Sequence, residues 1–308
     1  MPKSKKIFVS GSLAYDRIMN FPDQFSKHIL PDKIHNLNIC FLINKIQESF
    51  GGTAGNIAYN LALLEEKPYV LGVVGEDFSK YQKWLTRYKI NLSKIQEVKN
   101  QLTASAYIMT DKRDNQITAF YPGPVSKNYC QCIQKEKNID LAIISPDDKE
   151  RMLAYVQLYT QNKVKFIFDP GQQTPVFSAQ EFRKIFQSAY IVIGNDYEIG
   201  LISKKLKINI SKLKKLVKIL ITTKGAQGSE IYDNGKKIQI PAKRIKKIID
   251  PTGAGDAYRA GLIKGILNNW DLDQAGKLAS YIAASAVSYQ GTQEHHFNYQ
   301  KFLKKCLE

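Results

Sequence analysis

The stretch DPTGAGDAYRAG, residues 250–261, joins a glycine-containing turn to an apolar, helix-forming segment. Pro251 disfavours helical backbone just before it, and Thr252 can cap the helix that follows. Gly253 and Gly255 allow a tight turn that leaves backbone N–H groups exposed. A helix that begins here directs the positive end of its dipole at the turn. Together these features predict an anion-binding site.

Asp256 is unexpected in an anion site, because a carboxylate there repels phosphate. Its position makes sense if it accepts a proton from a hydroxyl group that attacks a phosphoryl group. An aspartate also favours the first turn of any helix on electrostatic grounds alone. Taken by itself, the stretch supports both interpretations.

Strand and helix patterns alternate along most of the chain. Short buried-strand patterns occur at residues 7–10, 69–74, 141–145, 165–169 and 190–193. Helical patterns lie between and after them at 55–64, 78–88, 148–161, 179–188, 196–205, 254–268 and 272–288. The alternation predicts an α/β fold in which helices cover both faces of a mostly parallel sheet. Ligands bind such sheets at the carboxyl ends of the strands.

Two segments, 12–46 and 103–123, interrupt this alternation. The second reads as strands 104–110 and 116–121 joined by a polar turn. Strands outside the alternating pattern predict a small separate sheet, placed to act as a lid over the strand ends. No linker or repeat divides the chain, so we predict a single domain over residues 1–308 that carries this lid.

Three further stretches carry polar residues at predicted strand ends or helix starts. In FGGTAGNIAYNLALL (50–64), Gly51 and Gly52 allow close approach of a ligand, and Asn56 can donate to and accept from hydroxyls. In IVIGNDYEIG (191–200), Asn195 and Glu198 suit an outer-shell role with Mg²⁺. For the first stretch, the alternative is a structural turn followed by a helix cap. For the second, the alternative is that Glu198 is an ordinary exposed glutamate. ILITTKGAQGS (219–229) ends a strand at Thr223 and Gly225.

Composition excludes several classes of protein. The chain has no P-loop, no G-x-G-x-x-G after its first strand and no H-E-x-x-H. Its four cysteines and four histidines show no metal-ligand spacing, which favours reduced thiols and a cytoplasmic protein. The chain has no run of 18 or more apolar residues, so the sequence predicts no membrane-spanning helix. The net charge of +17 gathers at 204–218 and 242–248. A solvated helix face explains the first cluster, with nucleic-acid binding as the alternative.

In this order and spacing, the motifs resemble those of the ribokinase-like (PfkB) carbohydrate kinase family. The resemblance is stronger to its adenosine kinase and broad-specificity nucleoside kinase branch, through HILPD (28–32), FGGTAGNIAYNLALL (50–64), QITAFYPG (116–123), FDPGQ (168–172), DPTGAGDAYRAG (250–261) and GTQEH (291–295). Simple sugar kinases of the family typically lack Pro251 and the FDPGQ and GTQ-H stretches. The resemblance implies a doubly wound α/β fold with a β-sheet lid that often mediates dimers.

The resemblance also implies roles for particular residues. Asp256 would be the general base for a 5′-hydroxyl, and Gly253, Ala254 and Gly255 would offer N–H groups to the transferring phosphoryl group. Asn195 and Glu198 would organise Mg²⁺ and its waters, and nucleotide contacts would come from Thr223, Gly225 and Thr252. Asp16 would hold the ribose diol beside Gly51, Gly52 and Asn56. A base would meet Phe41, Phe120 and Gln172.

The prediction is an ATP- and Mg²⁺-dependent nucleoside kinase, with adenosine as its first substrate. The alternative within the family is a ribokinase- or fructokinase-type sugar kinase. An alternative of another class is a non-catalytic protein that binds nucleotides or nucleic acid through its basic faces. No specific nucleic acid or membrane partner is expected of the kinase. Activation by K⁺, and the choice between a monomer and a lid-mediated homodimer, stay open, and the resemblance gives no role to Arg259.

Overall fold

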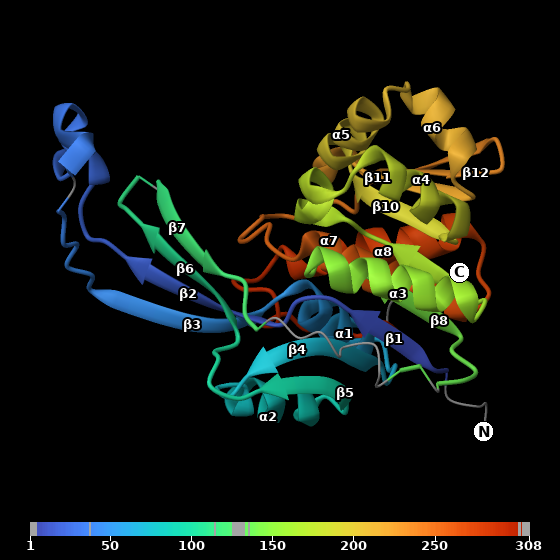
Figure 1. The fold of residues 1–308 in the computed structure, drawn as a ribbon, viewed down its shortest axis with the longest axis horizontal. Helices are drawn as coiled ribbons and strands as arrows, with labels where there is room; N and C mark the ends of the chain where they lie inside the picture. The colour runs from blue at the N-terminus through green and yellow to red at the C-terminus, as the bar shows by residue number, and fades with distance from the viewer. Residues whose placement is uncertain are drawn as a thin grey trace.

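The computed structural model describes residues 5–36, 38–113, 115–124, 133–134, 136–300 and 303. Two sheets make up the fold (Figure 1). The larger has nine strands in the order β13 (Lys236–Ile240), β12 (Ser229–Asp233), β11 (Ile219–Thr223), β10 (Ile191–Asn195), β9 (Phe166–Phe168), β8 (Leu141–Ile144), β1 (Ile7–Ser10), β4 (Tyr69–Gly75) and β5 (Asn91–Val98). Within this sheet the seven strands β11, β10, β9, β8, β1, β4 and β5 pair in parallel, and only the pairs β11–β12 and β12–β13 are antiparallel.

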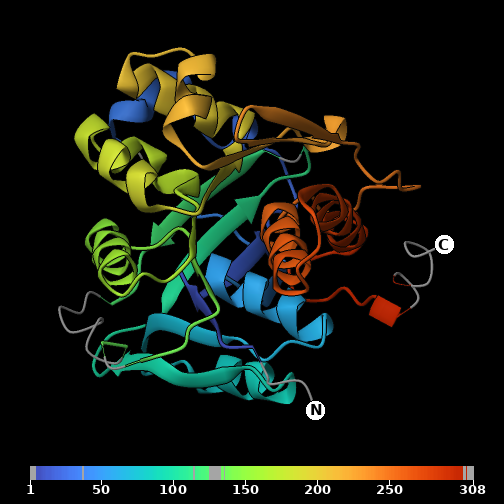
Figure 2. The ribbon, with the colours of Figure 1, turned by 90° about the vertical axis from the view of Figure 1, so that its right-hand side faces the viewer.

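Helices cover both faces of the larger sheet, as the strand–helix alternation predicts. One face packs against α1 (Thr53–Leu63), α2 (Ser79–Arg87), α7 (Ala254–Leu267) and α8 (Leu272–Ala286). The other packs against α3 (Lys149–Gln161), α4 (Ala179–Ser188), α5 (Asp196–Leu206) and α6 (Ile210–Leu216). Figure 2 shows α7 and α8 on the opposite side of the sheet from α3 and α4.

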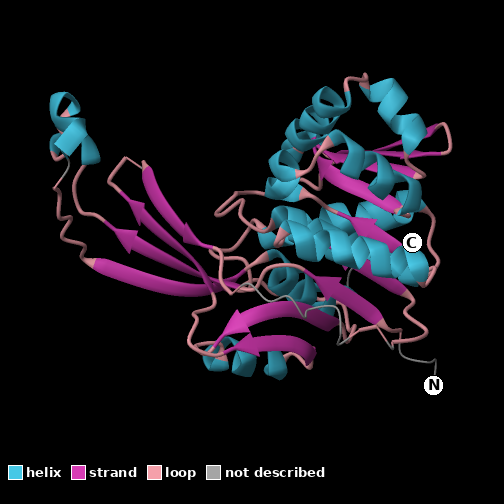
Figure 3. Ribbon diagram, in the orientation of Figure 1, coloured by secondary structure: helices cyan, strands magenta, loops and turns pink. Residues whose placement is uncertain are grey.

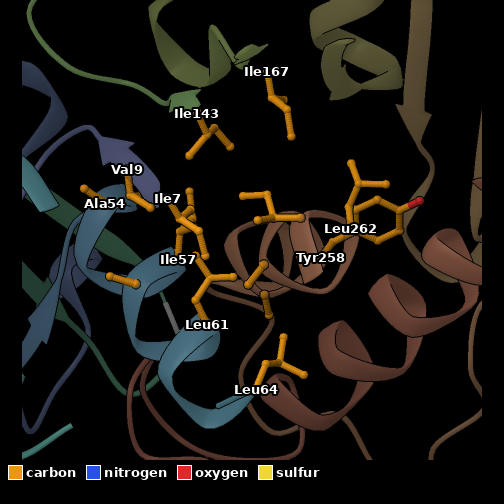
Figure 4. Packing of buried hydrophobic residues seen from close by; sticks show 14 of the residues in the cluster. Ile7, Val9, Ala54, Ile57, Leu61, Leu64, Ile143, Ile167, Tyr258 and Leu262 are labelled. Atoms are coloured by element: carbon orange, nitrogen blue, oxygen red, sulfur yellow. The ribbon is translucent and has the colours of Figure 1, made fainter. Parts of the chain in front are cut away.

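The strands are apolar on both faces because both faces are covered. Ile7 and Val9 of β1 point into the α1 side, while Phe8 points into the α3 side, and all three are fully buried. Ile57 and Leu61 extend from α1 toward the same β1 residues and the N-terminal half of α7 (Figure 4). This packing fixes α1 and α7 side by side beneath the sheet.

The second sheet is the small separate sheet that the sequence predicts, and we refer to it as the lid. Its strands have the order β3 (Lys45–Gly51), β2 (Ala14–Asn20), β6 (Ala104–Thr110) and β7 (Gln116–Tyr121). It projects away from the core, and the short 3-10 helices η1 (Phe25–Lys27) and η2 (Pro31–Asn36) lie at its far tip (Figure 3). The lid's first segment extends past residue 46, since β3 runs to Gly51 and leads directly into α1.

The structure corrects the sequence interpretation at three further places. The helical pattern over 204–218 is two helices, because Lys207 takes the left-handed conformation (φ 55°) between α5 and α6. The edge strand β5 was not predicted. Thr252 does not cap α7, whose N-cap is Gly253. Among the helices of the described residues, none combines the length and apolar character needed to cross a membrane.

Candidate active site

The glycine turn lies at the N-terminus of α7, at the base of the lid. Gly253 adopts a left-handed conformation (φ 76°), and a Cβ atom on it would lie 2.9 Å from Cγ2 of Thr292. The first N–H groups of a helix have no carbonyl partners within it, and no side chain caps this one. The Ala254 N–H donates to the carbonyl of Pro251 at 3.3 Å. Asp250 closes the turn, because its Oδ1 accepts from the N–H of Thr252 at 2.9 Å.

Asp256, in the first turn of α7, meets Asn56 of α1. Nδ2 of Asn56 donates to Oδ2 of Asp256 at 2.8 Å. Burial raises the pKa of the Asp256 carboxyl to about 7, although the charge of Arg259 and the hydrogen bond from Asn56 act to lower it. Two residues that the sequence places in different motifs are therefore in direct contact.

One turn further along α7, Arg259 forms an ion pair with Asp169, which follows β9. Arg259 is 6% exposed and Asp169 is 2% exposed. Nη2 donates to Oδ1 at 2.8 Å, and Nε donates to Oδ2. The carboxylates of Asp169, Asp256 and Glu198 raise the pKa of Arg259 against the effect of its burial. Sequence reasoning missed this pair, although FDPGQ and DPTGAGDAYRAG contain both residues.

The lid presents Asp16 and Phe120 on one face. Asp16 of β2 lies opposite Ser49 of β3 and Ala106 of β6, and Ala106 lies opposite Phe120 of β7. Residues directly opposite each other across strands share a face. Phe120 is 59% exposed. The pKa of Asp16 is raised to about 6, mainly by burial and to a smaller extent by the negative charge of Asp250. The carboxylate on the lid therefore senses the charge of the glycine turn.

The two adjacent glycines lie where β3 meets α1. Asp16 fills the space beside Gly51, where a Cβ atom would lie 2.3 Å from Oδ2 of the carboxylate. Gly52 is the N-cap of α1 with φ 84°, and a Cβ atom there would lie 2.5 Å from the Ser12 carbonyl oxygen. Neither position accepts a side chain, so glycine at both allows the Asp16 carboxylate and the backbone of residues 12–14 to pack closely against this turn.

The structure does not bring the other predicted base-binding residues to Phe120. Phe41 packs inside the lid tip, with its ring centroid 4.9 Å from that of Phe21 and 5.2 Å from that of Phe25. Gln172 is exposed at the start of η3 (Gly171–Val176), on the core rather than on the lid. Of the three residues, only Phe120 shares a face with Asp16.

Three of the predicted nucleotide-binding residues, Asn195, Thr223 and Gly225, lie at or just after the carboxyl ends of β10 and β11, and the fourth, Thr252, lies in the turn before α7. Asn195 and Thr223 lie opposite each other in the parallel register of these strands. Gly225 follows with φ 54°, and nothing lies within 4 Å of the place its Cβ would take. Asn195 also forms a capping box with Glu198, with hydrogen bonds of 2.8 and 2.7 Å.

Glu198 is the candidate magnesium residue. Burial raises the pKa of its carboxyl, and the capping box occupies Oε2. Within the described part of the chain, no group of three acidic, His or Cys side chains could hold a metal ion. A single strand-end carboxylate fits Mg²⁺, which keeps several waters and shares oxygens of a bound nucleotide.

The C-terminal GTQEH stretch also enters the site, which sequence reasoning did not predict. Thr292 Oγ1 donates to the carbonyl of Phe50 at 2.9 Å, and the Gly291 N–H donates to Asp250 at 3.0 Å. Nε2 of Gln293 donates to Oδ1 of Asn56 at 3.0 Å. In the sequence, this stretch stands out only because it resembles a motif of the nucleoside kinase branch. Nothing in its composition indicates which groups it contacts.

Comparison with known proteins agrees with this fold. Residues 12–297 match the sequence model of the pfkB family carbohydrate kinases. A protein named nucleoside kinase from Methanocaldococcus jannaschii is 33% identical over 306 residues, which cover 98% of this chain and 97% of that protein. The crystal structure of a nucleoside kinase from that organism, described as an archaeal member of the ribokinase family, has a TM-score of 0.88 at 32% identity and covers 99% of both chains.

The ligand-free nucleoside kinase of Burkholderia thailandensis is also similar, with a TM-score of 0.86 and 36% identity over 97% of this chain and 99% of that one. That kinase has also been solved with inosine and in a complex described as ADP-inosine. The ribokinase-like architecture and these similarities lead to one conclusion: the chain belongs to the pfkB family of carbohydrate kinases, which are phosphotransferases.

Proposed function

We propose that the protein is an ATP- and Mg²⁺-dependent nucleoside kinase that phosphorylates the 5′-hydroxyl group, with adenosine as its first substrate. The observation that carries the proposal is the 2.8 Å hydrogen bond from Asn56 to Asp256. It joins a residue suited to binding a hydroxyl-rich acceptor to a carboxylate at a helix N-terminus. That is the arrangement a proton acceptor beside a phosphoryl site requires.

In this mechanism Asp256 takes the proton of the attacking 5′-hydroxyl. The N–H groups of residues 253–255 stabilise negative charge on the transferring phosphoryl group. Mg²⁺, held through waters by Glu198 and Asn195, would neutralise charge on the nucleotide phosphates when bound. Thr223, Gly225 and Thr252 would border ATP.

On the acceptor side, the two oxygens of Asp16 accept hydrogen bonds from the ribose diol. Gly51, Gly52 and Asn56 complete this part of the site. Phe120 supports the proposal for a base-stacking residue, because it is exposed and lies on the same lid face as Asp16. Phe41 and Gln172 remain proposals that rest on the family resemblance. The oligomeric state, monomer or lid-mediated dimer, and any need for K⁺ likewise remain proposals.

A substrate panel tests the proposal. ADP release is followed with Mg-ATP and adenosine, inosine, guanosine, cytidine, ribose or fructose as acceptor. We expect turnover of nucleosides, fastest with adenosine, and loss of activity with EDTA. Inosine is the main competitor, because the similar B. thailandensis kinase was solved with inosine. Turnover of ribose or fructose alone would instead identify a sugar kinase. No turnover, with steeply salt-dependent RNA binding, would identify the non-catalytic alternative.

A further inference from the structure

A chain of side-chain hydrogen bonds runs from α2 to Asp256. Nε1 of Trp84 donates to Oε1 of Gln293 at 3.0 Å. Nε2 of Gln293 donates to Oδ1 of Asn56 at 3.0 Å, and Nδ2 of Asn56 donates to Oδ2 of Asp256 at 2.8 Å. Gln293 is 2% exposed and Asn56 is 5% exposed, so both middle members are shielded from water.

Tyr81 closes a side branch of this chain. The second N–H of Gln293 donates to the Tyr81 hydroxyl, which donates in turn to the carbonyl of Gly51 at 2.8 Å. Both hydrogens of the Gln293 amide are therefore used, and its oxygen accepts from Trp84. The amide has no spare group with which to make a different arrangement.

The indole group sets the direction of every bond in the chain. An indole N–H can only donate, so the atom of Gln293 that faces Trp84 must be oxygen. The amide nitrogen of Gln293 then faces Asn56, and Asn56 must present its oxygen to that nitrogen. Consequently the NH₂ group of Asn56, and not its oxygen, faces the carboxylate of Asp256.

We propose that Trp84 and Gln293 are positioning residues, which lock Asn56 as a hydrogen-bond donor to Asp256 and so keep Asp256 ionised and ready to accept a proton. The inference rests on the proposed role of Asp256 as general base. Neither residue touches the reacting atoms, since each acts through Asn56. In the reverse orientation Asn56 would offer Asp256 an oxygen, which can pair only with a protonated carboxyl group.

Other groups around Asp256 also influence its protonation. Arg259 on the same helix lowers its pKa, and Asp169 at the end of β9 raises it. The Tyr81 hydroxyl on α2 is neutral, because burial holds the pKa of Tyr81 far above its usual range. The hydrogen bond from Asn56 and the charge of Arg259 both lower the pKa of Asp256, whereas burial raises it. Loss of the Asn56 donor therefore moves the titration of Asp256 to higher pH.

Gln293→Glu reverses the chain with little change in shape. Glutamate still accepts from Trp84 but has no N–H for Asn56, so Asn56 has to turn its NH₂ group toward residue 293. Its oxygen then faces Asp256, and the new negative charge favours the protonated form as well. Trp84→Phe removes the donor that sets the direction and, although smaller, keeps an aromatic ring against Phe50 and Tyr59. Trp270→Phe, at the chain's other tryptophan, is the matched control.

The first measurement is the pH profile of kcat. We expect the acid limb of Gln293→Glu to move up by about one pH unit, a loss of about tenfold on the acid side that recovers at high pH. Trp84→Phe should shift the limb in the same direction by less, and Trp270→Phe should not shift it. An equal loss at every pH in both chain variants would show a purely structural role and overturn the proposal.

The second measurement needs no activity. The sequence has two tryptophans, so the ¹⁵N spectrum of the labelled protein has two indole N–H signals, which Trp270→Phe assigns. Asp256→Asn should move the Trp84 signal and leave the Trp270 signal in place. An unmoved Trp84 signal would contradict the chain even if the protein phosphorylates nucleosides. A moved signal supports the chain even if the substrate panel refutes the proposed function.

Discussion

Arg259 and Asp169 form a doubly hydrogen-bonded ion pair that is almost closed to solvent, one helical turn from Asp256. The pair connects α7 to the end of β9, the middle strand of the large sheet. Its guanidinium group lowers the pKa of Asp256. A single side chain therefore contributes to the packing of the core and to the electrostatics of the site.

Removal of one member of this pair is expected to be costly. Arg259→Met leaves the buried carboxylate of Asp169 without a partner and should lower the free energy of unfolding by about 3–5 kcal/mol. The double variant Arg259→Met, Asp169→Leu should recover much of that loss, because no unpaired charge remains. Urea denaturation measures both. A single variant as stable as the parent protein would contradict the buried pair.

The activity should have an acid limb set by Asp256. Burial raises the pKa of this carboxyl to about 7. A general base works only when ionised, so kcat should fall below that pH by about tenfold for each further unit. Nucleoside turnover at saturating Mg-ATP between pH 5 and 9 measures the limb. A limb near pH 4 would mean that Asp256 is not the titrating base.

The raised pKa of Asp256 also makes stability depend on pH. The native state binds this proton more tightly than the unfolded state, so the contribution is present at about pH 4 and is lost as pH rises through about 7. Asp256→Asn carries no such loss. Its melting temperature should exceed that of the parent protein by about 2 °C or more at pH 8, with the gap closing toward pH 4. If the melting temperature of Asp256→Asn relative to that of the parent were lower at pH 8 than at pH 4, this pH dependence would be contradicted.

Asp16→Ala should act on the acceptor alone. Loss of two hydrogen bonds to a charged oxygen pair predicts a rise in the nucleoside KM of roughly 10- to 100-fold, with the KM for ATP little changed. Asp23→Ala is a suitable control, because Asp23 lies at the lid tip in a surface pair with Lys27. An unchanged nucleoside KM in Asp16→Ala would remove Asp16 from the ribose site.

Much of the fold could be predicted because its strands are short and apolar and its helices have a clear apolar side. The break at Lys207 could not, since a left-handed residue without glycine or asparagine leaves no local signal. β5 (NLSKIQEV) is only partly buried at the sheet edge and lacks the apolar run of its neighbours. In both places tertiary packing, rather than local preference, sets the structure.

The site divides in the same way. Asp256, Asn56 and Glu198 could be predicted because each lies in a motif next to a strand end or helix start. Gln293 and Trp84 could not, because they are 209 positions apart. A glutamine in a turn and a tryptophan in a largely polar helix carry no local indication that they pair with each other. A role for Phe41 as a base contact stays a prediction, and the structure shows that its ring packs against Phe21 and Phe25 at the lid tip.

The most direct test of Asp256 as general base is the kcat of Asp256→Asn with adenosine and Mg-ATP, measured beside the affinity for both ligands. Asparagine keeps the size of the side chain and cannot take the proton. We therefore expect nearly normal binding and a loss in kcat on the order of 10²–10⁴. A variant that retains the parent kcat would contradict the assignment.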